Sequence, residues 1–546
     1  MYFRFPLLYP LLALLVPLAV DCEPILPDTP GTPSVSIEEE GRSYDDLNAT
    51  VAQALNLSPV HSLLNNTRHR VLLSGFQSEP HGHAKTTEDR FEAAVYDYTG
   101  GRTIILSGGI PFDPRRVSLS EANTQPLVIS DELAEAGRMA DRHSDMIVTG
   151  GMPPFITHDF PNGTSHRILN IAIIDENSSR LALVNMNNGT VDFPQRPSEE
   201  PLACTAPPPS GQQSITSAPG TAKIRITQGG AELWTLEAVR PAASSGHRGS
   251  GIELRHVKYK GKSVLYRAHV PILNVEYKPP LVAGCGPYYR DWQREEYPLQ
   301  CTGSNIAPGF RRCDSPAETI LDPPHRDGGN FGGVGVYVEG QEVVLKSQLR
   351  AGWYRYVSEW RFHVDGTLRP RFGFAAVYQP PFCVCQVHHH HAYWRLDFDI
   401  GTSGNNLVRE FNKPPLFGSS NYHDHAYEIR RPKDASHQRH WEISNTRTGN
   451  TYSLIPGTND GTSDSYGVGD VWVVRYHDNE LDDGVTVVGG SASETQANID
   501  MFLTGEPVKN EDVVIWYGAH FKHDQTHELG ASHIVGPTIR PLRWGA

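Results

Sequence analysis

Val387-His388-His389-His390-His391-Ala392-Tyr393-Trp394-Arg395-Leu396-Asp397-Phe398-Asp399 is the stretch of this sequence that decides the fold. Its four histidines lead directly into alternating aromatic and aliphatic residues, which is the pattern of a β-strand. Residues two apart on a strand share a face, so His388 and His390 can point together while His389 and His391 point away. Imidazole nitrogen suits copper, zinc, iron and nickel. The stretch therefore predicts a strand that carries half of a transition-metal site.

Strand patterns continue on both sides of this stretch, from residue 222 almost to the end of the chain. Turn signals separate them, in keeping with the 50 glycines and 42 prolines of the whole sequence. Many short strands without helices favour a large antiparallel β-sandwich over residues 222–546. The clearest runs are Ile224–Thr227, Val264–Val270, Val343–Lys346, Trp353–Val364, Trp394–Ile400, Val471–Tyr476 and Val513–Trp516.

Residues 46–198 mix helical and strand patterns. Leu47, Val51 and Leu55 recur at helical spacing, and residues 130–143 read as a helix with Ser130 as its N-cap. Strand pairs at 90–106 and 167–186 complete one or two small α+β domains. A Pro/Ser/Gly-rich linker over residues 199–221 separates them from the sandwich, and residues 23–45 read as a flexible leader.

The N-terminus predicts a secreted protein. Residues 1–22 read as a cleaved signal peptide, because one positive charge precedes an apolar run with interior prolines. No later segment is apolar for long enough to span a bilayer. Six glycosylation sequons support an extracellular location. Their acceptors are Asn48, Asn56, Asn65, Asn162, Asn177 and Asn188.

Charge and cysteine content exclude some classes of function. The balance of 48 Lys+Arg against 62 Asp+Glu, a net charge of −14, argues against nucleic acid or an anionic membrane as a partner. Seven cysteines are too few for a disulfide scaffold, but Cys285, Cys301 and Cys313 are close enough to include a bridge. Cys383 and Cys385 with the histidines leave a zinc site as an alternative.

Beyond residue 222 the chain resembles the copper amine oxidases, on several blocks in the family's order. Residues 88–198 resemble the family's small N2 and N3 α+β domains more weakly. The resemblance implies a β-sandwich catalytic domain and a homodimer. The blocks are Gly251–Arg267 with Val275–Tyr277, Tyr354–Asp365, His388-x-His390 running into Arg395–Asp399, Arg439–Asn445, and Asn510–His520.

The resemblance implies a copper site and a quinone cofactor. By position, His388, His390 and His520 would be the copper ligands. Tyr354 precedes Asp365 at the family's spacing and would be the precursor of topaquinone. The quinone would form a Schiff base with a primary amine and, with molecular oxygen, yield aldehyde, ammonia and hydrogen peroxide.

Further roles follow from the same resemblance. Asp291 would be the base that removes the α-proton, with a pKa raised by burial so that it acts near neutral pH. Tyr289 would be the gate, and Tyr277 would hydrogen-bond the quinone. The residues after Asp291 depart from the family, which leaves Glu295 or Glu296 as alternatives for the base.

A second metal site follows from the resemblance. It would be a peripheral, calcium-type site built from carboxylates and backbone carbonyls, the hard oxygen ligands that calcium takes. Its members would be Asp397, Phe398, Asp399, Asp512 and Val513.

Two residues beside Tyr354 depart from the family pattern. Trp353 stands where the family has Asn, and Arg355 stands where it has Asp or Glu. The first hypothesis is a secreted copper-dependent primary amine oxidase. The second is a copper-binding relative without quinone chemistry, either a pseudoenzyme or another copper-dependent oxidoreductase. The third is a non-catalytic β-sandwich binding protein.

Overall fold

The computed structural model describes most of the chain from residue 31 to 545. The predicted signal peptide, most of the linker, the acceptors Asn162 and Asn177, and all cysteines except Cys301 and Cys313 lie outside the described residues. The described ranges are 31–39, 44–78, 89–122, 125–126, 128–143, 147–151, 166–174, 179–193, 210, 212, 220–277, 288–377, 387–485, 489–523 and 534–545.

The first of two large sheets contains the histidine strand at its centre. It has 11 strands, with the order β1-β10-β11-β12-β13-β22-β30-β28-β25 and with β14 and β29 off this path. All the pairings among its described strands are antiparallel. The strands are β1 (Ser34–Glu39), β10 (Thr221–Gln228), β11 (Ala231–Val239), β12 (Glu253–Tyr259), β13 (Lys262–Tyr277), β14 (Tyr288–Arg290), β22 (His388–Phe398), β25 (Ile429–Arg431), β28 (Val471–Arg475), β29 (Gly489–Gly490) and β30 (Val513–His523).

The second large sheet has 13 strands, in the order β16-β17-β18-β19-β20-β21-β32-β27-β26-β23-β24, with β15 on β19 and β31 on β21. Only the pair β17–β18 is parallel among its described ladders. The strands are β15 (Glu296–Tyr297), β16 (Gly303–Ala307), β17 (Phe310–Cys313), β18 (Val334–Glu339), β19 (Glu342–Ala351), β20 (Tyr354–His363), β21 (Leu368–Ala376), β23 (Asn406–Phe411), β24 (Tyr422–Asp424), β26 (His440–Asn445), β27 (Thr451–Ile455), β31 (Ile534–Val535) and β32 (Thr538–Arg543).

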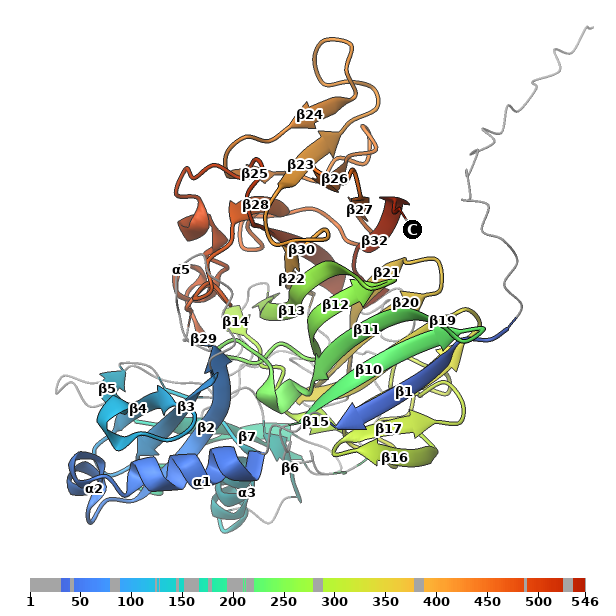
Figure 1. The fold of residues 1–546 in the computed structure, drawn as a ribbon. Helices are drawn as coiled ribbons and strands as arrows, with labels where there is room; N and C mark the ends of the chain where they lie inside the picture. The colour runs from blue at the N-terminus through green and yellow to red at the C-terminus, as the bar shows by residue number, and fades with distance from the viewer. Residues whose placement is uncertain are drawn as a thin grey trace, which may run out of the picture.

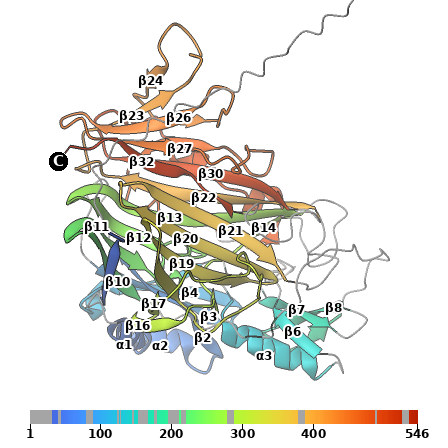
Figure 2. The ribbon, with the colours of Figure 1, turned by 90° about the vertical axis from the view of Figure 1, so that its right-hand side faces the viewer.

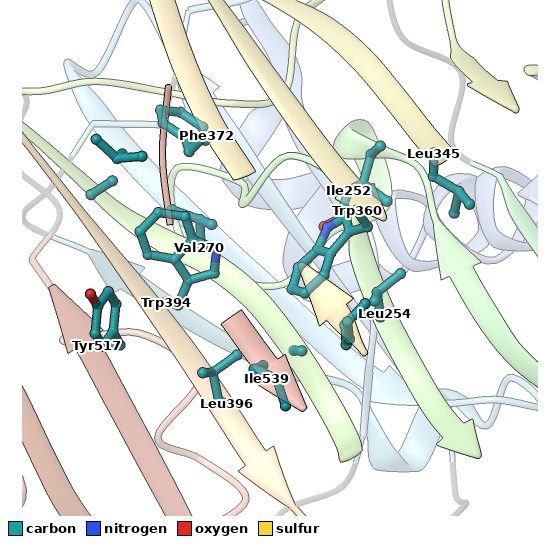
Figure 3. Packing of buried hydrophobic residues seen from close by; sticks show 14 of the residues in the cluster. Ile252, Leu254, Val270, Leu345, Trp360, Phe372, Trp394, Leu396, Tyr517 and Ile539 are labelled. Atoms are coloured by element: carbon teal, nitrogen blue, oxygen red, sulfur yellow. The ribbon is translucent and has the colours of Figure 1, made fainter. Parts of the chain in front are cut away.

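The two sheets share one hydrophobic core. Trp394 and Leu396 from β22 lie in the same buried cluster as Trp360 from β20 and Phe372 from β21, and Figure 3 shows these side chains between the strands. Residues on alternating positions of each strand face this core, as period-two geometry requires. The predicted fold class, a mainly β protein with a large antiparallel sandwich, is confirmed.

Two small α+β units lie at one end of the sandwich (Figures 1 and 2). Each is a four-stranded sheet with helical cover. One apolar cluster lies within the first unit, and the cluster of the second unit also includes Leu72, Tyr96 and Tyr98 of the first. A buried ion pair between Arg167 and Glu132 stabilises the second unit. The elements are α1 (Tyr44–Leu55), α2 (Ser58–Leu64), β2 (His69–Ser78), β3 (Asp89–Asp97), β4 (Arg102–Gly109), η1 (Pro114–Arg116), β5 (Ser118–Ala122), α3 (Ser130–Asp141), β6 (Ile147–Gly151), β7 (Ile168–Ile174), β8 (Ser179–Asn185) and β9 (Val191–Asp192).

The structure corrects two local expectations. The flexible leader expected over 23–45 does not hold for Ser34–Glu39, which form β1 on the edge of the large sheet against β10. Val35 and Ile37 alternate with polar residues there, and Ile37 is buried in the main core. The predicted helix does begin at Ser130, but its N-cap position is Ile129. Shorter helices lie elsewhere, at η2 (Pro241–Ala243), α5 (Ala492–Thr495) and η3 (Ile499–Phe502).

One disulfide lies in the described residues. It joins Cys301 to Cys313 across the β16–β17 hairpin, so the bridge falls within the group of cysteines that the spacing indicated. Among the described residues, no helix is both long and apolar enough to cross a membrane.

Candidate active site

The candidate site is built from side chains on three neighbouring strands of the first sheet, β13, β22 and β30. Tyr277 on β13 pairs with His388 on β22, which pairs with His523 on β30. Two residues earlier on β30, Phe521 pairs with His390. Because directly paired residues lie on the same face of a sheet, these side chains share the face that packs on β20 and β21.

Three imidazoles come together on this face. The rings of His388, His390 and His523 are buried, with centroids 4.5 Å (His388–His523), 5.0 Å (His388–His390) and 6.4 Å (His390–His523) apart. His523 Nδ1 lies 2.9 Å from His388 Nε2. Nitrogen donors of this kind are those that copper prefers, so the three residues fit a copper ion.

His520 does not join this group, so the predicted grouping of His388, His390 and His520 does not form. It pairs with His391, and their Nδ1 atoms lie 3.0 Å apart. His520 is an odd number of residues before His523, and successive side chains on a strand point to opposite faces. It therefore lies on the other side of the sheet, and His523 takes its place as the third candidate ligand.

Tyr354 is held between the histidines and Tyr277. Its hydroxyl lies 2.6 Å from His388 Nε2 and 3.0 Å from the Tyr277 hydroxyl. The Tyr277 ring stacks on the His388 ring at 4.8 Å. Tyr354 is the first residue of β20, and its ring is buried. The structure thus brings the predicted cofactor tyrosine directly to a predicted metal ligand.

Asp291 lies at the other end of the same cluster. The Tyr356 hydroxyl donates a hydrogen bond to Asp291 Oδ2 and lies 3.2 Å from His390 Nδ1. Burial raises the pKa of the Asp291 carboxyl to about 7, and the hydrogen bond from Tyr356 opposes that rise. The carboxyl can thus change its protonation state near neutral pH, as a catalytic base requires.

The two alternative bases have other partners. The carboxylate of Glu296 forms a buried ion pair with Arg240. Burial lowers the pKa of the Arg350 guanidinium, and the charge of nearby Glu295 opposes that shift. Asp291 is hydrogen-bonded to Tyr356 of the tyrosine and histidine cluster, so the geometry favours it.

Tyr289 lies beside Tyr277 rather than beside the histidines. It pairs with Val275 in the short strand β14, and its buried ring meets the Tyr277 ring edge-on with centroids 6.1 Å apart. Its role as a gate stays a prediction.

The two unusual neighbours of Tyr354 differ in what they contact. Arg355 points away from the histidines, with Nε 2.6 Å from Asp327 Oδ1 and its guanidinium 3.9 Å from the centre of the Tyr297 ring. Its charge is therefore neutralised by Asp327. Trp353 packs within the site, with its ring centroid 5.9 Å from that of Tyr354 and 6.3 Å from that of Tyr277.

The predicted peripheral carboxylates also come together. Asp397, Asp399 and Asp512 each offer an oxygen atom, and these atoms lie within 4.8 Å of one another. Phe398 and Val513 pair in register between them, which fits the predicted supply of backbone oxygen. Hard oxygen donors at this spacing fit a calcium ion.

Two residues of the cluster were missed by the sequence reasoning. Tyr356 shares the face of Tyr354 because it lies two residues further along β20, so a count of strand positions could have found it. His523 could have been found by counting positions along the last strand. It lies two residues after the apolar Phe521, so both side chains face the core.

A family comparison bears on this arrangement. Residues 325–528 match the family model described as copper amine oxidase, enzyme domain. This part of the chain is therefore similar to the enzyme domain of copper amine oxidases. The matched segment includes Tyr354 and the three clustered histidines, and it begins after Tyr277, Tyr289 and Asp291. No curated protein matches the chain.

Solved structures of copper amine oxidases resemble this chain in fold. A copper-containing benzylamine oxidase from Hansenula polymorpha has a TM-score of 0.57 at 11% identity, covering 90% of this chain and 96% of its own. A lysyl oxidase from Pichia pastoris has a TM-score of 0.54 at 12% identity, with 92% and 89% covered. An amine oxidase from Aspergillus nidulans has a TM-score of 0.50 at 14% identity, with 91% and 87% covered. At these identities the likeness concerns the fold.

Proposed function

We propose that this chain is a copper-dependent primary amine oxidase. The observation that carries the proposal is the buried cluster in which Tyr354 contacts His388 while Asp291 connects to His390 through Tyr356. A metal-binding group, a tyrosine and an acid with a raised pKa then lie within one site, which is the combination that oxidation of an amine requires.

The reaction removes two electrons and two protons from the CH–NH₂ unit of a primary amine and delivers them to molecular oxygen. Water supplies the oxygen of the aldehyde, and ammonia and hydrogen peroxide are the other products. Copper held by His388, His390 and His523, together with topaquinone derived from Tyr354, would supply the redox chemistry and the carbonyl that reacts with the amine.

The side chains around this group have defined tasks in the proposal. Asp291 in its ionised form accepts the proton from the α-carbon of the amine, and the low-dielectric surroundings keep it basic enough. Tyr356 orients that carboxylate through its hydrogen bond. Tyr277 holds the oxygen of Tyr354 at hydrogen-bond distance and so fixes the position of the ring.

The test is a reaction with phenylhydrazine after the purified protein has been loaded with copper in air. We expect a coloured adduct in the wild type and none in Tyr354→Phe, because the substitution removes only the phenolic hydroxyl, which conversion of the ring to a quinone requires. Tyr337→Phe, in the second sheet outside the cluster, is the matched control and should retain the adduct. A wild type that binds copper and gives no adduct would contradict the proposal.

Trp353 favours a second candidate function, a copper-binding relative without quinone chemistry. Its ring lies against both Tyr354 and Tyr277, and a ring packed in this way resists reorientation of Tyr354. Copper bound by the three histidines with no phenylhydrazine adduct would support this function. Arg355 does not favour it, because its charge is paired with Asp327 on the other side of the strand.

The pH dependence of turnover follows from the raised pKa of Asp291. Since the base must be ionised, kcat/KM expressed on the concentration of neutral amine should fall about tenfold for each pH unit below about 7. The hydrogen bond from Tyr356 lowers the pKa of Asp291, so Tyr356→Phe should move the acidic limb to higher pH. The pH profiles of kcat/KM for the wild type and for Tyr356→Phe, both measured with benzylamine, give this shift. Ionisation of the amine affects the two profiles equally and therefore cancels in the comparison. Identical acidic limbs in the two pH profiles would contradict the proposal that Tyr356 lowers the pKa of Asp291.

Secretion, glycosylation, dimer formation and a peripheral calcium ion belong to the same proposal. Four of the six predicted acceptors, Asn48, Asn56, Asn65 and Asn188, lie in the described residues and are exposed, as attachment of a glycan requires. Enzymatic deglycosylation of protein secreted from a eukaryotic host should reduce its mass.

A further inference from the structure

The opposite face of the histidine strand carries a second group of metal-ligating side chains. Glu276, His391 and Asp464 each offer one ligand atom, and these three atoms lie within 4.8 Å of one another. Glu276 and His391 are buried, whereas Asp464 is exposed. The group therefore lies at the boundary between the sheet and solvent.

Strand register places the first two members of this group. Glu276 pairs with His389, and Asn274 pairs with His391, so Glu276 and His391 lie on the face of β13 and β22 that is turned away from His388 and His390. His389 lies beside them, with Nδ1 3.8 Å from Glu276 Oε2. The strand that supplies two candidate copper ligands on one face thus supplies two further histidines, His389 and His391, on the other.

A loop after β27 brings the third member. Asp464 Oδ1 accepts hydrogen bonds from the backbone N–H groups of Tyr466 at 2.9 Å and Gly467 at 2.6 Å, which fixes its carboxylate. A Cβ atom on Gly467 would lie 2.1 Å from His391 Nδ1. Only glycine lets this loop come so close to the imidazole, so the approach of Asp464 depends on it.

His391 is also oriented from its other side. Its Nδ1 lies 3.0 Å from His520 Nδ1, and His520 Nε2 lies 3.2 Å from Asp470 Oδ1. Histidines that ligate metals are held in this way, with one ring nitrogen bonded to a neighbour that fixes the tautomer and the other directed at the ion. This arrangement assigns ligation to His391 Nε2 and a positioning role to His520.

We propose that Glu276, His391 and Asp464 form a second metal site, distinct from the histidine cluster, that binds a zinc-type divalent ion. One imidazole and two carboxylates suit zinc, which takes three protein ligands and leaves a fourth position for water in its open sites. The bound ion joins β13, β22 and the loop that contains Asp464. The site is independent of amine oxidation and of the copper ligands on the other face.

The experiment counts zinc in the copper-loaded, full-length protein. Excess calcium is present to occupy oxygen-only sites, and zinc is measured by mass spectrometry after dialysis against a zinc buffer. After dialysis, we expect the wild type to hold one more zinc ion per chain than Asp464→Asn or Glu276→Gln. The affinity of these two variants for zinc should be at least about tenfold lower than that of the wild type. Asp424→Asn, an exposed acid on β24, is the matched control and should keep the zinc.

Two further variants separate this site from the histidine cluster. His520→Gln should weaken zinc binding about tenfold to a hundredfold without removing a ligand, and His523→Ala should leave it unchanged. Equal zinc content in the wild type and in Asp464→Asn would overturn the proposal. So would loss of zinc in His523→Ala with retention in Asp464→Asn, because zinc would then be bound by the other face. Circular dichroism checks that each variant is folded, and copper content is a second check for every variant except His523→Ala, which removes a candidate copper ligand.

Discussion

Asp291→Asn is expected to lower kcat for a primary amine by about 10²- to 10⁴-fold, the usual contribution of a general base. The asparagine keeps the shape of the side chain and can still accept the hydrogen bond from Tyr356, but it cannot take a proton. Because Asp291 is buried and carries a pKa of about 7, no solvent base has ready access to the same position. Steady-state kinetics with benzylamine measure the loss.

The alternative acids provide the controls for this prediction. Glu295→Gln and Glu296→Gln should retain kcat, because Glu296 is paired with Arg240 and Glu295 lies near Arg350. Copper content and the phenylhydrazine adduct should be unchanged in Asp291→Asn, since neither depends on proton abstraction from the substrate. A normal kcat in Asp291→Asn with a severe loss in Glu295→Gln would transfer the role of base to Glu295.

His523→Ala is expected to weaken copper binding by more than about 100-fold, beyond the range seen when only a supporting partner of a ligand is lost. The substitution removes one of three nitrogen donors from a buried site and leaves a gap beside His388, whose Nε2 lies 2.9 Å from His523 Nδ1. Copper stoichiometry and a competitive titration with a chelator measure the loss independently of enzyme activity.

His520→Ala is the matched control, since it removes a buried histidine from the same strand but from the other face. It should bind copper within a few-fold of the wild type. If His520→Ala lost copper while His523→Ala retained it, the grouping of His523 with His388 and His390 would be refuted, and the ligand set first expected from the sequence would be restored.

Much of the fold could be predicted because strand formation is a local property. The alternation of Tyr393, Trp394, Arg395 and Leu396 indicates a strand whichever strands become its neighbours, and the parity of His388 and His390 places both on one face. The sequence reasoning failed at Ser34–Glu39, where a Pro- and Ser-rich composition concealed a short alternating strand that is stable only because the large sheet offers it an edge.

The raised pKa of Asp291 shows why the site could be predicted only in part. Its position after Tyr277 identified it as a candidate, but its environment comes from Tyr356 of the opposite sheet and from burial between the two layers. Likewise, the charge of Arg355 beside Tyr354 suggested an altered active site. Its partner Asp327 lies in a distant segment, and together they remove that charge from the site.

The sequence by itself determined the strands, their faces and the residue types that can bind a metal, because these depend on side-chain chemistry and on a period of two residues. Tertiary structure alone decided which histidines meet. His388 and His523 are 135 residues apart, and only the hydrogen-bonded register of β22 and β30 sets them opposite each other. A shift of one residue in that register would have turned His523 to the other face and His520 to the face of His388 and His390.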